Sequence, residues 1–279
     1  LFKKIPNLRA YADSLTNAMV EFYSESQKRF TSDQHPHYIY SPRELTRWKY
    51  AINEGIDFIN SLEDLVRLWA HEAQRLFEDR LVEKEEREWC QLKIDEIAYK
   101  HFSGLNQSSL KRPIIFSRNN TKNYQSVGLP ELKEYITDKL TQFNEEEFNV
   151  ELVIFDEVVD HIIKIDRVLR QPIGHMLLVG SSGVGKTTLS KYVSWINGLK
   201  VFQIKAGRNY SIQNFDDDLR DVMKRAGCRG EKITFIFDES NVLSVSFMER
   251  MNALLASGEI PGLFEGEELT SLVNCYNEF

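Results

Sequence analysis

The stretch Gly180-Ser181-Ser182-Gly183-Val184-Gly185-Lys186-Thr187 matches the pattern G-x-x-x-x-G-K-[ST]. An apolar run at 176–179 precedes it, and a helical pattern at 188–193 follows it. This order of strand, Gly-rich loop and helix is typical of a loop that binds phosphate groups through its backbone N–H groups. The alternative is a Gly-rich turn that arose by chance, and the flanking strand and helix patterns argue against it.

The fixed positions of this loop have separate physical roles. Glycines let the backbone wrap closely around phosphates, Lys186 supplies a positive charge to the β- and γ-phosphates, and the Thr187 hydroxyl can coordinate Mg²⁺. The N-terminus of the following helix adds N–H groups and a partial positive charge. The sequence therefore predicts a nucleoside-triphosphate site. The expected phosphate-binding residues are Gly180, Ser181, Ser182, Gly183, Val184, Gly185, Lys186, Thr187 and Thr188.

A second apolar run, 233–237, ends in two carboxylates, Asp238 and Glu239. In P-loop enzymes such a strand lies near the first one, so we expect Asp238 to reach the Mg²⁺ shell together with Thr187. Glu239 is then placed to polarise the attacking water. Many buried strands end at a charged turn, but this run follows a phosphate loop with a helix and a strand between, which favours the functional interpretation.

The composition is that of a soluble globular protein. The chain has 279 residues, is 42% hydrophobic and 28% charged, and has a formal net charge of -7, so binding to nucleic acid is not expected. No apolar run approaches the roughly 18 residues that span a membrane, and no signal-peptide pattern is present. Three scattered cysteines, Cys90, Cys228 and Cys275, form no metal-binding spacing and predict thiols in a reducing compartment. We expect a cytosolic protein that contacts neither nucleic acid nor membrane, and the start at Leu1 suggests a fragment.

The chain divides into a helical part and a part in which strands and helices alternate. Apolar residues at helical spacing predict an all-α domain over 1–105. Residues 106–128 lose this periodicity and are predicted to be a linker. From 129 to 279, predicted strands at 176–179, 199–204 and 233–237 alternate with helices. This order predicts an α/β domain, a parallel sheet with helices on both faces and ligands at the carboxyl ends of its strands.

The P-loop half resembles the AAA+ ATPases and, within them, the motor ring of the dynein heavy chains of cytoplasmic type. Besides the loop, the resemblance is carried by 167–175 (RVLRQPIGH), 201–205 (VFQIK), 215–220 (FDDDLR), 238–243 (DESNVL) and 261–266 (PGLFEG). Upstream, 40–48 (YSPRELTRW) is similar to the helical small subdomain that closes a module. The likeness covers nearly the whole chain.

This resemblance implies a ring of six linked modules with nucleotide sites between neighbours. Residues 1–105 would be the small subdomain of the third module, with Arg43 as its sensor-type arginine. Residues 129–279 would be the large subdomain of the fourth module, incomplete at its C-terminal side. The implied cofactors are ATP or ADP with Mg²⁺, the adenine would contact Leu152 and Val153, and Glu239 would be the catalytic residue.

The resemblance also implies partners and a location in the cytoplasm and on the cytoskeleton. The partners are neighbouring AAA+ modules of the same heavy chain and, indirectly, dynein light and intermediate chains and dynactin. Microtubules would be bound only through parts outside this chain, in keeping with 42 Asp and Glu against 35 Lys and Arg.

The sequence is compatible with two functions. The module either hydrolyses ATP to power minus-end-directed movement along microtubules, or it is a regulatory or structural module that holds nucleotide with little hydrolysis of its own. A P-loop kinase would need a lid and an acceptor pocket that the sequence does not indicate.

Overall fold

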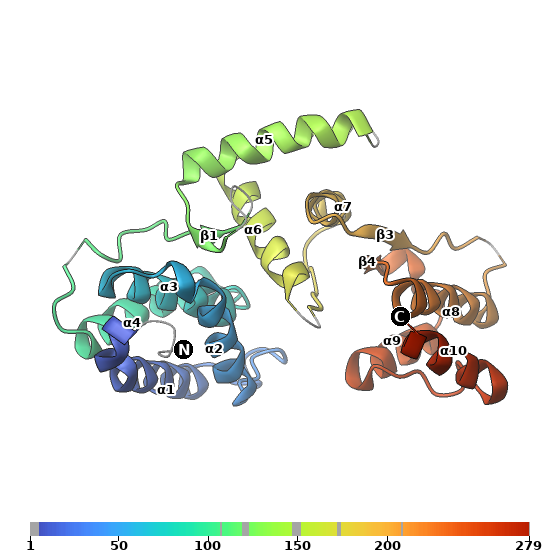
Figure 1. Ribbon diagram of the computed structural model, residues 1–279, viewed down its shortest axis with the longest axis horizontal. Helices are drawn as coiled ribbons and strands as arrows, with labels where there is room; N and C mark the ends of the chain where they lie inside the picture. Colours follow the sequence, from blue (N-terminus) through green and yellow to red (C-terminus); the bar gives the residue numbers. More distant parts are fainter. Residues whose placement is uncertain are drawn as a thin grey trace. The chain divides into compact units, whose positions relative to one another are not determined.

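The computed structural model describes residues 6–106, 108–118, 123–146, 152–171, 174–207 and 209–278. It divides into two compact units, unit 1 (Leu1–Ile136) and unit 2 (Thr137–Phe279) (Figure 1). The helix α5 (Leu129–Glu146) contains the division. The two units therefore meet inside α5, whereas the sequence predicted domain boundaries at 105 and 128.

Unit 1 is built mainly of helices. These are η1 (Pro6–Tyr11), α1 (Ala12–Arg29), α2 (Arg43–Gly55), η2 (Ile56–Phe58), α3 (Leu62–Ala73), the π-helical turn η3 (Gln74–Glu78) and α4 (Lys84–His101). Ser61 caps α3, because its hydroxyl accepts the Asp64 N–H at 3.1 Å. In Figure 1, α1 to α4 lie side by side as one bundle.

The core of unit 1 is centred on aromatic rings. Trp48, from α2, is fully buried, and its ring centroid lies 5.9 Å from that of Phe22, 5.5 Å from Trp69 and 5.3 Å from Phe77. Its indole Nε1 donates to the Trp69 carbonyl at 3.2 Å, so the ring is buried without losing its hydrogen bond. One side chain thus joins α1, α2, α3 and η3.

The described residues of the segment predicted as a linker, 106, 108–118 and 123–128, pack on this bundle. The segment contains a short antiparallel pair, β1 (Phe116–Ser117) with β2 (Gln125–Ser126). Ile114, Phe116 and Tyr124 are buried in the same core as Trp48, and the Ile114 carbonyl is hydrogen-bonded to His71 Nδ1 at 2.9 Å. The apolar residues here have no regular spacing, and so the sequence pattern did not reveal that they are buried.

Unit 2 contains a parallel pair of strands, β3 (Lys200–Gln203) and β4 (Ile233–Ile236), in the register Lys200↔Ile233 to Gln203↔Ile236. The helices of this unit, besides the end of α5, are α6 (Asp156–Arg170), α7 (Lys186–Ile196), α8 (Ile212–Arg229), η4 (Glu239–Asn241), α9 (Val245–Ser257) and α10 (Gly266–Glu278). Figure 1 shows the strand pair next to α8.

Helices pack on the two faces of this pair. Side chains alternate between faces along a strand, so Phe235 and Phe237 point one way and Thr234 the other. The two phenylalanines pack against a core formed with α8 and α9, which includes Phe215 and Phe247. On the opposite face, the Ser194 hydroxyl of α7 donates to Thr234 Oγ1 at 3.0 Å.

The strand predicted at 176–179 is not formed. Leu177 is 86% exposed and Val179 is 87% exposed, and both lie in irregular backbone. A strand needs a neighbour for its N–H and C=O groups, and within the described ranges β3 and β4 pair only with each other. The α/β arrangement of unit 2 is therefore described by one parallel pair rather than by the larger sheet that we predicted.

None of the three cysteines is in a disulfide, and burial raises the pKa of the Cys90 thiol well above its usual value. Within the part of the chain that the structure describes, no helix is both long enough and apolar enough to cross a bilayer.

We predict that Trp48→Ala lowers the free energy of unfolding of unit 1 by about 3–5 kcal/mol, because it opens a cavity between three aromatic rings. Chemical denaturation of the chain, followed by circular dichroism, measures this loss. Tyr50→Ala is the matched control: Tyr50 lies on the same helix but is 64% exposed, and its replacement should change stability by less than about 0.5 kcal/mol. Equal losses for the two variants would contradict the assigned core.

Candidate nucleotide-binding site

The Gly-rich loop leads directly into α7, which begins at Lys186. Gly183 has φ +83° and Gly185 has φ +84°, in the left-handed region that favours glycine. A Cβ built at either position would meet no described atom within 4 Å, so these two glycines are required by the backbone conformation and not by lack of space. The predicted loop followed by a helix is thus present, with a left-handed residue at its last position.

Lys186 folds back over the loop. Its Nζ donates to the carbonyl oxygens of Gly180 and Ser181, both at 2.8 Å. The hydrogen-bond ladder of α7 starts where Leu189 N donates to Gly185 O, at 2.8 Å. The N–H groups before Leu189 precede this ladder, and so they lie at the end of the helix that attracts anions.

Three other predicted residues lie in or just before the first turn of α7. Thr187 and Thr188 are half-buried, and Val184 is 59% exposed. The loop therefore combines an accessible backbone, a lysine ammonium and a threonine hydroxyl within a few residues.

The far end of α7 is fixed by a buried carboxylate. Asp166, on α6, is fully buried, and its Oδ2 accepts from Arg170 Nε at 2.8 Å. Its Oδ1 accepts at 2.9 Å from the side-chain amide of Asn197, the C-cap of α7. The same amide nitrogen donates to Val193 O at 2.9 Å, so α6 holds the last turn of α7.

Aromatic contacts from α5 add to this support. Phe143 lies edge-on to Tyr192 at 5.4 Å and to Trp195 at 5.5 Å between ring centroids. The Trp195 Nε1 donates to Glu146 Oε2 at 2.9 Å. Helix α7 is therefore held by α5, α6 and β4, mainly through its second half.

The two acidic residues after β4 have different surroundings. Asp238 is half-buried, its Oδ2 accepts from Gln203 Nε2 at 2.8 Å, and its Oδ1 accepts from the backbone N–H of Ser240 at 3.0 Å. It caps η4, whereas Glu239 is the exposed first residue of that turn. The structure thus holds the predicted metal ligand, Asp238, more firmly than the predicted base, Glu239.

The loop and Asp238 belong to the same unit, and the hydrogen bond between Ser194 and Thr234 joins their helix and strand. Among the described residues, no hydrogen bond or ion pair is found that joins the loop directly to Asp238. The contact between helix and strand lies at the last turn of α7, not at the loop.

Other predicted residues lie in two places. Leu152 is half-buried and Val153 is 75% exposed, in the segment before α6. Arg43 is exposed at the start of α2 in unit 1, and the next residue, Glu44, is buried and accepts from the Ser41 N–H at 2.8 Å.

Sequence reasoning missed two residues that hold Asp238, namely Gln203 and Asn241. Asn241 is buried, its Oδ1 accepts the Asp238 N–H at 3.1 Å, and its Nδ2 donates to Ile204 O at 2.9 Å. In the sequence, Gln203 is a polar residue at the end of an apolar strand and Asn241 is a polar residue just after one. Many turns share this pattern, so it did not mark either residue as functional.

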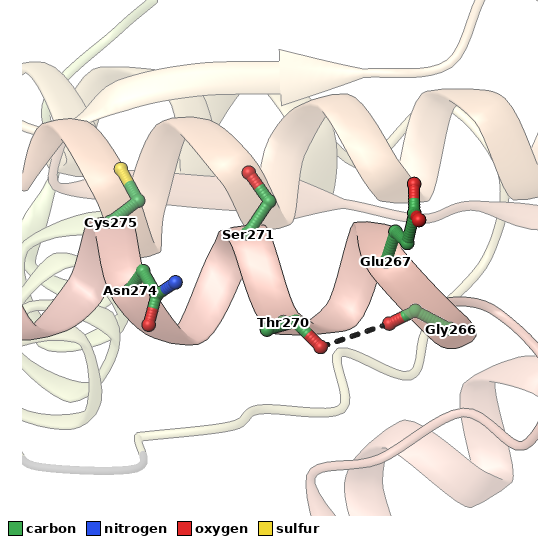
Figure 2. A pocket seen from close by; sticks show the side chains of 6 residues that line it. All are labelled: Gly266, Glu267, Thr270, Ser271, Asn274 and Cys275. Carbon is green, nitrogen blue, oxygen red and sulfur yellow. Dashed lines mark hydrogen bonds between the residues drawn. The ribbon is translucent and has the colours of Figure 1, made fainter.

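A surface hollow of about 760 Å³ lies elsewhere, along α10. Figure 2 shows that its lining comes from this one helix. The lining residues are Gly266, Glu267, Thr270, Ser271, Asn274 and Cys275. It contains none of the predicted site residues and offers no cation for a phosphate.

Two family models match the chain. Residues 150–278 match one described as P-loop containing dynein motor region D4, and residues 1–87 match one described as dynein heavy chain, ATPase lid domain. The chain belongs to the dynein heavy chain family. The resemblance to an AAA+ motor region is therefore confirmed, with the P-loop half as region D4 and the helical half as a lid.

Relatives agree with these matches over the full chain. The cytoplasmic dynein heavy chain of Paramecium tetraurelia is 64% identical over 278 residues, that of Dictyostelium discoideum 61% over 280 and that of Drosophila melanogaster 57% over 281. Each alignment covers 100% of this chain and 6% of the relative. The chain thus spans a small part of the length of the heavy chains that it matches.

We predict that Asp166→Ala lowers the free energy of unfolding of unit 2 by about 3 kcal/mol, because it breaks a buried ion pair with Arg170 on α6 and the hydrogen bond to Asn197 at the end of α7. Native-state hydrogen exchange of the backbone amides of α7 measures the loss. The matched control is Asp160→Ala, which removes the more exposed Lys164–Asp160 pair on the same helix and should cost no more than about 1 kcal/mol. A loss for Asp166→Ala as small as that of the control would mean that Asp166 does not anchor α7.

Proposed function

We propose that this chain is the nucleotide-binding part of a dynein motor module and binds ATP or ADP with Mg²⁺. The observation that carries the proposal is the loop itself, in which left-handed Gly183 and Gly185 lead into a helix that begins with Lys186. Membership of the dynein heavy chain family and the match to a P-loop motor region support it.

The residues present fit such a ligand. The N–H groups at the start of α7 suit phosphate oxygens, and Thr187 and Asp238 supply the hard oxygen atoms that Mg²⁺ prefers. When bound, Mg²⁺ supplies positive charge that offsets the charge on the β- and γ-phosphates. Leu152 and Val153 are the proposed contacts of the adenine.

Lys186 has to change partners when nucleotide binds. It would exchange the carbonyls of Gly180 and Ser181 for phosphate oxygens, which adds the attraction between opposite charges to hydrogen bonds that the ammonium already donates.

Glu239 is the proposed base. Its carboxylate would accept a proton from the water that attacks the γ-phosphorus, and the bond to the leaving ADP oxygen would break. The module would in this way power or regulate minus-end-directed movement along microtubules.

The wider setting is also a proposal. The chain would lie in a ring of six modules in the cytoplasm, on the cytoskeleton. Its direct partners would be neighbouring modules of the same heavy chain, with Arg43 acting as a sensor for the site of the preceding module. Microtubules, light and intermediate chains and dynactin would be reached through other parts of the motor.

One observation favours the alternative function, a module that holds nucleotide with little hydrolysis. Glu239 is exposed, and an exposed side chain in solvent is not pre-oriented toward a substrate as a catalytic base should be. Asp238, by contrast, is held by Gln203 and Ser240, so metal binding is better prepared than proton transfer.

We predict that Lys186→Ala, made in the complete motor, weakens Mg-ATP binding at this site by at least about 100-fold, because the loop loses its phosphate-directed cation. Isothermal titration calorimetry measures the affinity. Lys191→Ala is the control, since Lys191 is exposed on the same helix beyond the loop, and it should leave the affinity unchanged. Unaltered binding in Lys186→Ala would refute the proposed site.

We predict that Glu239→Gln leaves ATP bound but slows its cleavage at this site by about 10²–10⁴-fold, because an amide keeps the shape of the side chain and cannot accept the proton. Single-turnover hydrolysis by the complete motor separates binding from cleavage. Glu249→Gln, at an exposed position on α9, is the matched control. If cleavage at this site were equally fast in Glu239→Gln, the nucleotide-holding function would be preferred.

A further inference from the structure

Gln203 occupies a defined position at the carboxyl end of β3. It is paired in register with Ile236, and Asp238 lies two residues further along the neighbouring chain. Asp238 has extended backbone (φ -117°, ψ 176°), so the strand alternation continues and its side chain is on the same face as those of Ile236 and Gln203. The amide of Gln203 reaches across the strands and donates to Asp238 Oδ2 at 2.8 Å.

The other groups of Asp238 are held as well. Its Oδ1 accepts from Ser240, and its N–H donates to Asn241, whose amide in turn donates to Ile204 O, the residue after Gln203. The end of β3 therefore contacts Asp238 twice, directly through Gln203 and indirectly through Asn241. Such a half-buried carboxylate has few rotamers open to it.

A carboxylate held in this way still has room for a cation. Each carboxylate oxygen offers about two lone-pair sites, and Gln203 uses one site on Oδ2. The Gln203 amide is neutral, so it orients the oxygen and leaves the negative charge of Asp238 uncompensated. A lysine or arginine in its place would offset the charge that a divalent cation needs.

We propose that Gln203 is a positioning residue for Asp238, which holds the carboxylate in the orientation that meets the Mg²⁺ of a bound nucleotide. This inference rests on the proposed function of the loop and of Asp238. Removing a group that orients a metal ligand typically lowers metal affinity or activity by about 10–100-fold.

The test measures how much Mg²⁺ strengthens nucleotide binding. In the complete motor, a fluorescent ATP analogue is titrated with Mg²⁺ present or with EDTA. The contribution of this site is the difference from the Lys186→Ala motor. The ratio of the two affinities is the Mg²⁺ enhancement, and Asp238→Asn gives its value when the ligand itself is lost.

Gln203→Leu should reduce this enhancement by about 10-fold or more and leave the affinity in EDTA unchanged. Gln203→Met, which keeps the length of the side chain but has no group to donate to Asp238, should also reduce it, and serves if the leucine variant does not fold. The matched control is Gln213→Leu, since Gln213 is exposed on α8 and should keep the full enhancement.

Each other outcome has one meaning. Equal losses with Mg²⁺ and with EDTA would show that Gln203 supports the fold only, and no loss in either Gln203 variant would show that Asp238 needs no positioning; both overturn the proposal. If Asp238→Asn retained the enhancement, or the unaltered motor showed no difference from Lys186→Ala, the proposed function itself would fail, and with it the role of Gln203.

Discussion

The buried charge of Asp166 is the constraint on which unit 2 depends. A carboxylate without solvent must be fully hydrogen-bonded, and Asp166 meets this need through Arg170 of its own helix and Asn197 at the end of α7. Because Asn197 also bonds Val193, the carboxylate fixes the last turn of a second helix. The need to satisfy one buried charge thus fixes the last turn of α7, which α5 and β4 also contact.

The same helix then joins the other parts of the site. Its second half contacts α5 through Phe143 and β4 through Thr234, while its first turn carries the loop. A helix held at its far end leaves its N-terminal N–H groups and Lys186 accessible at the surface. Firm packing and an accessible anion-binding end are thus obtained from one element.

The parts of this structure that could be predicted from sequence are those set by local chemistry. The Gly-rich pattern implied tight turns followed by a helix, and Gly183, Gly185 and the start of α7 at Lys186 agree with it. The cap that Ser61 forms on α3 is another local feature, because the cap and its partner Asp64 are three residues apart. The family was recognisable from short sequence motifs that are spread along the chain.

Features that depend on distant partners could not be predicted in this way. The run at 176–179 has strand composition, but forming a strand requires a neighbour, and pairing is not encoded in the run itself. Ile114, Phe116 and Tyr124 are buried against helices such as α3, and the hydrogen-bonded pair His71 and Ile114 lies 43 residues apart. Gln203 and Asn241 matter through a carboxylate more than 30 residues from Gln203, and a polar residue at a strand end has many possible uses.

The π-helical turn η3 has a consequence for the phase of the helix that it extends. From Trp69 to Phe77, a regular α-helix would rotate about 80° beyond two full turns. Phe77 would then leave the face of the helix from which Trp69 stacks on Trp48. The wider turn at Gln74–Glu78 takes up that excess, so both rings reach Trp48. The spacing of these two aromatic residues does not fit the α-helical repeat. The wider π-helical turn takes in one additional residue, and the helix continues without a break.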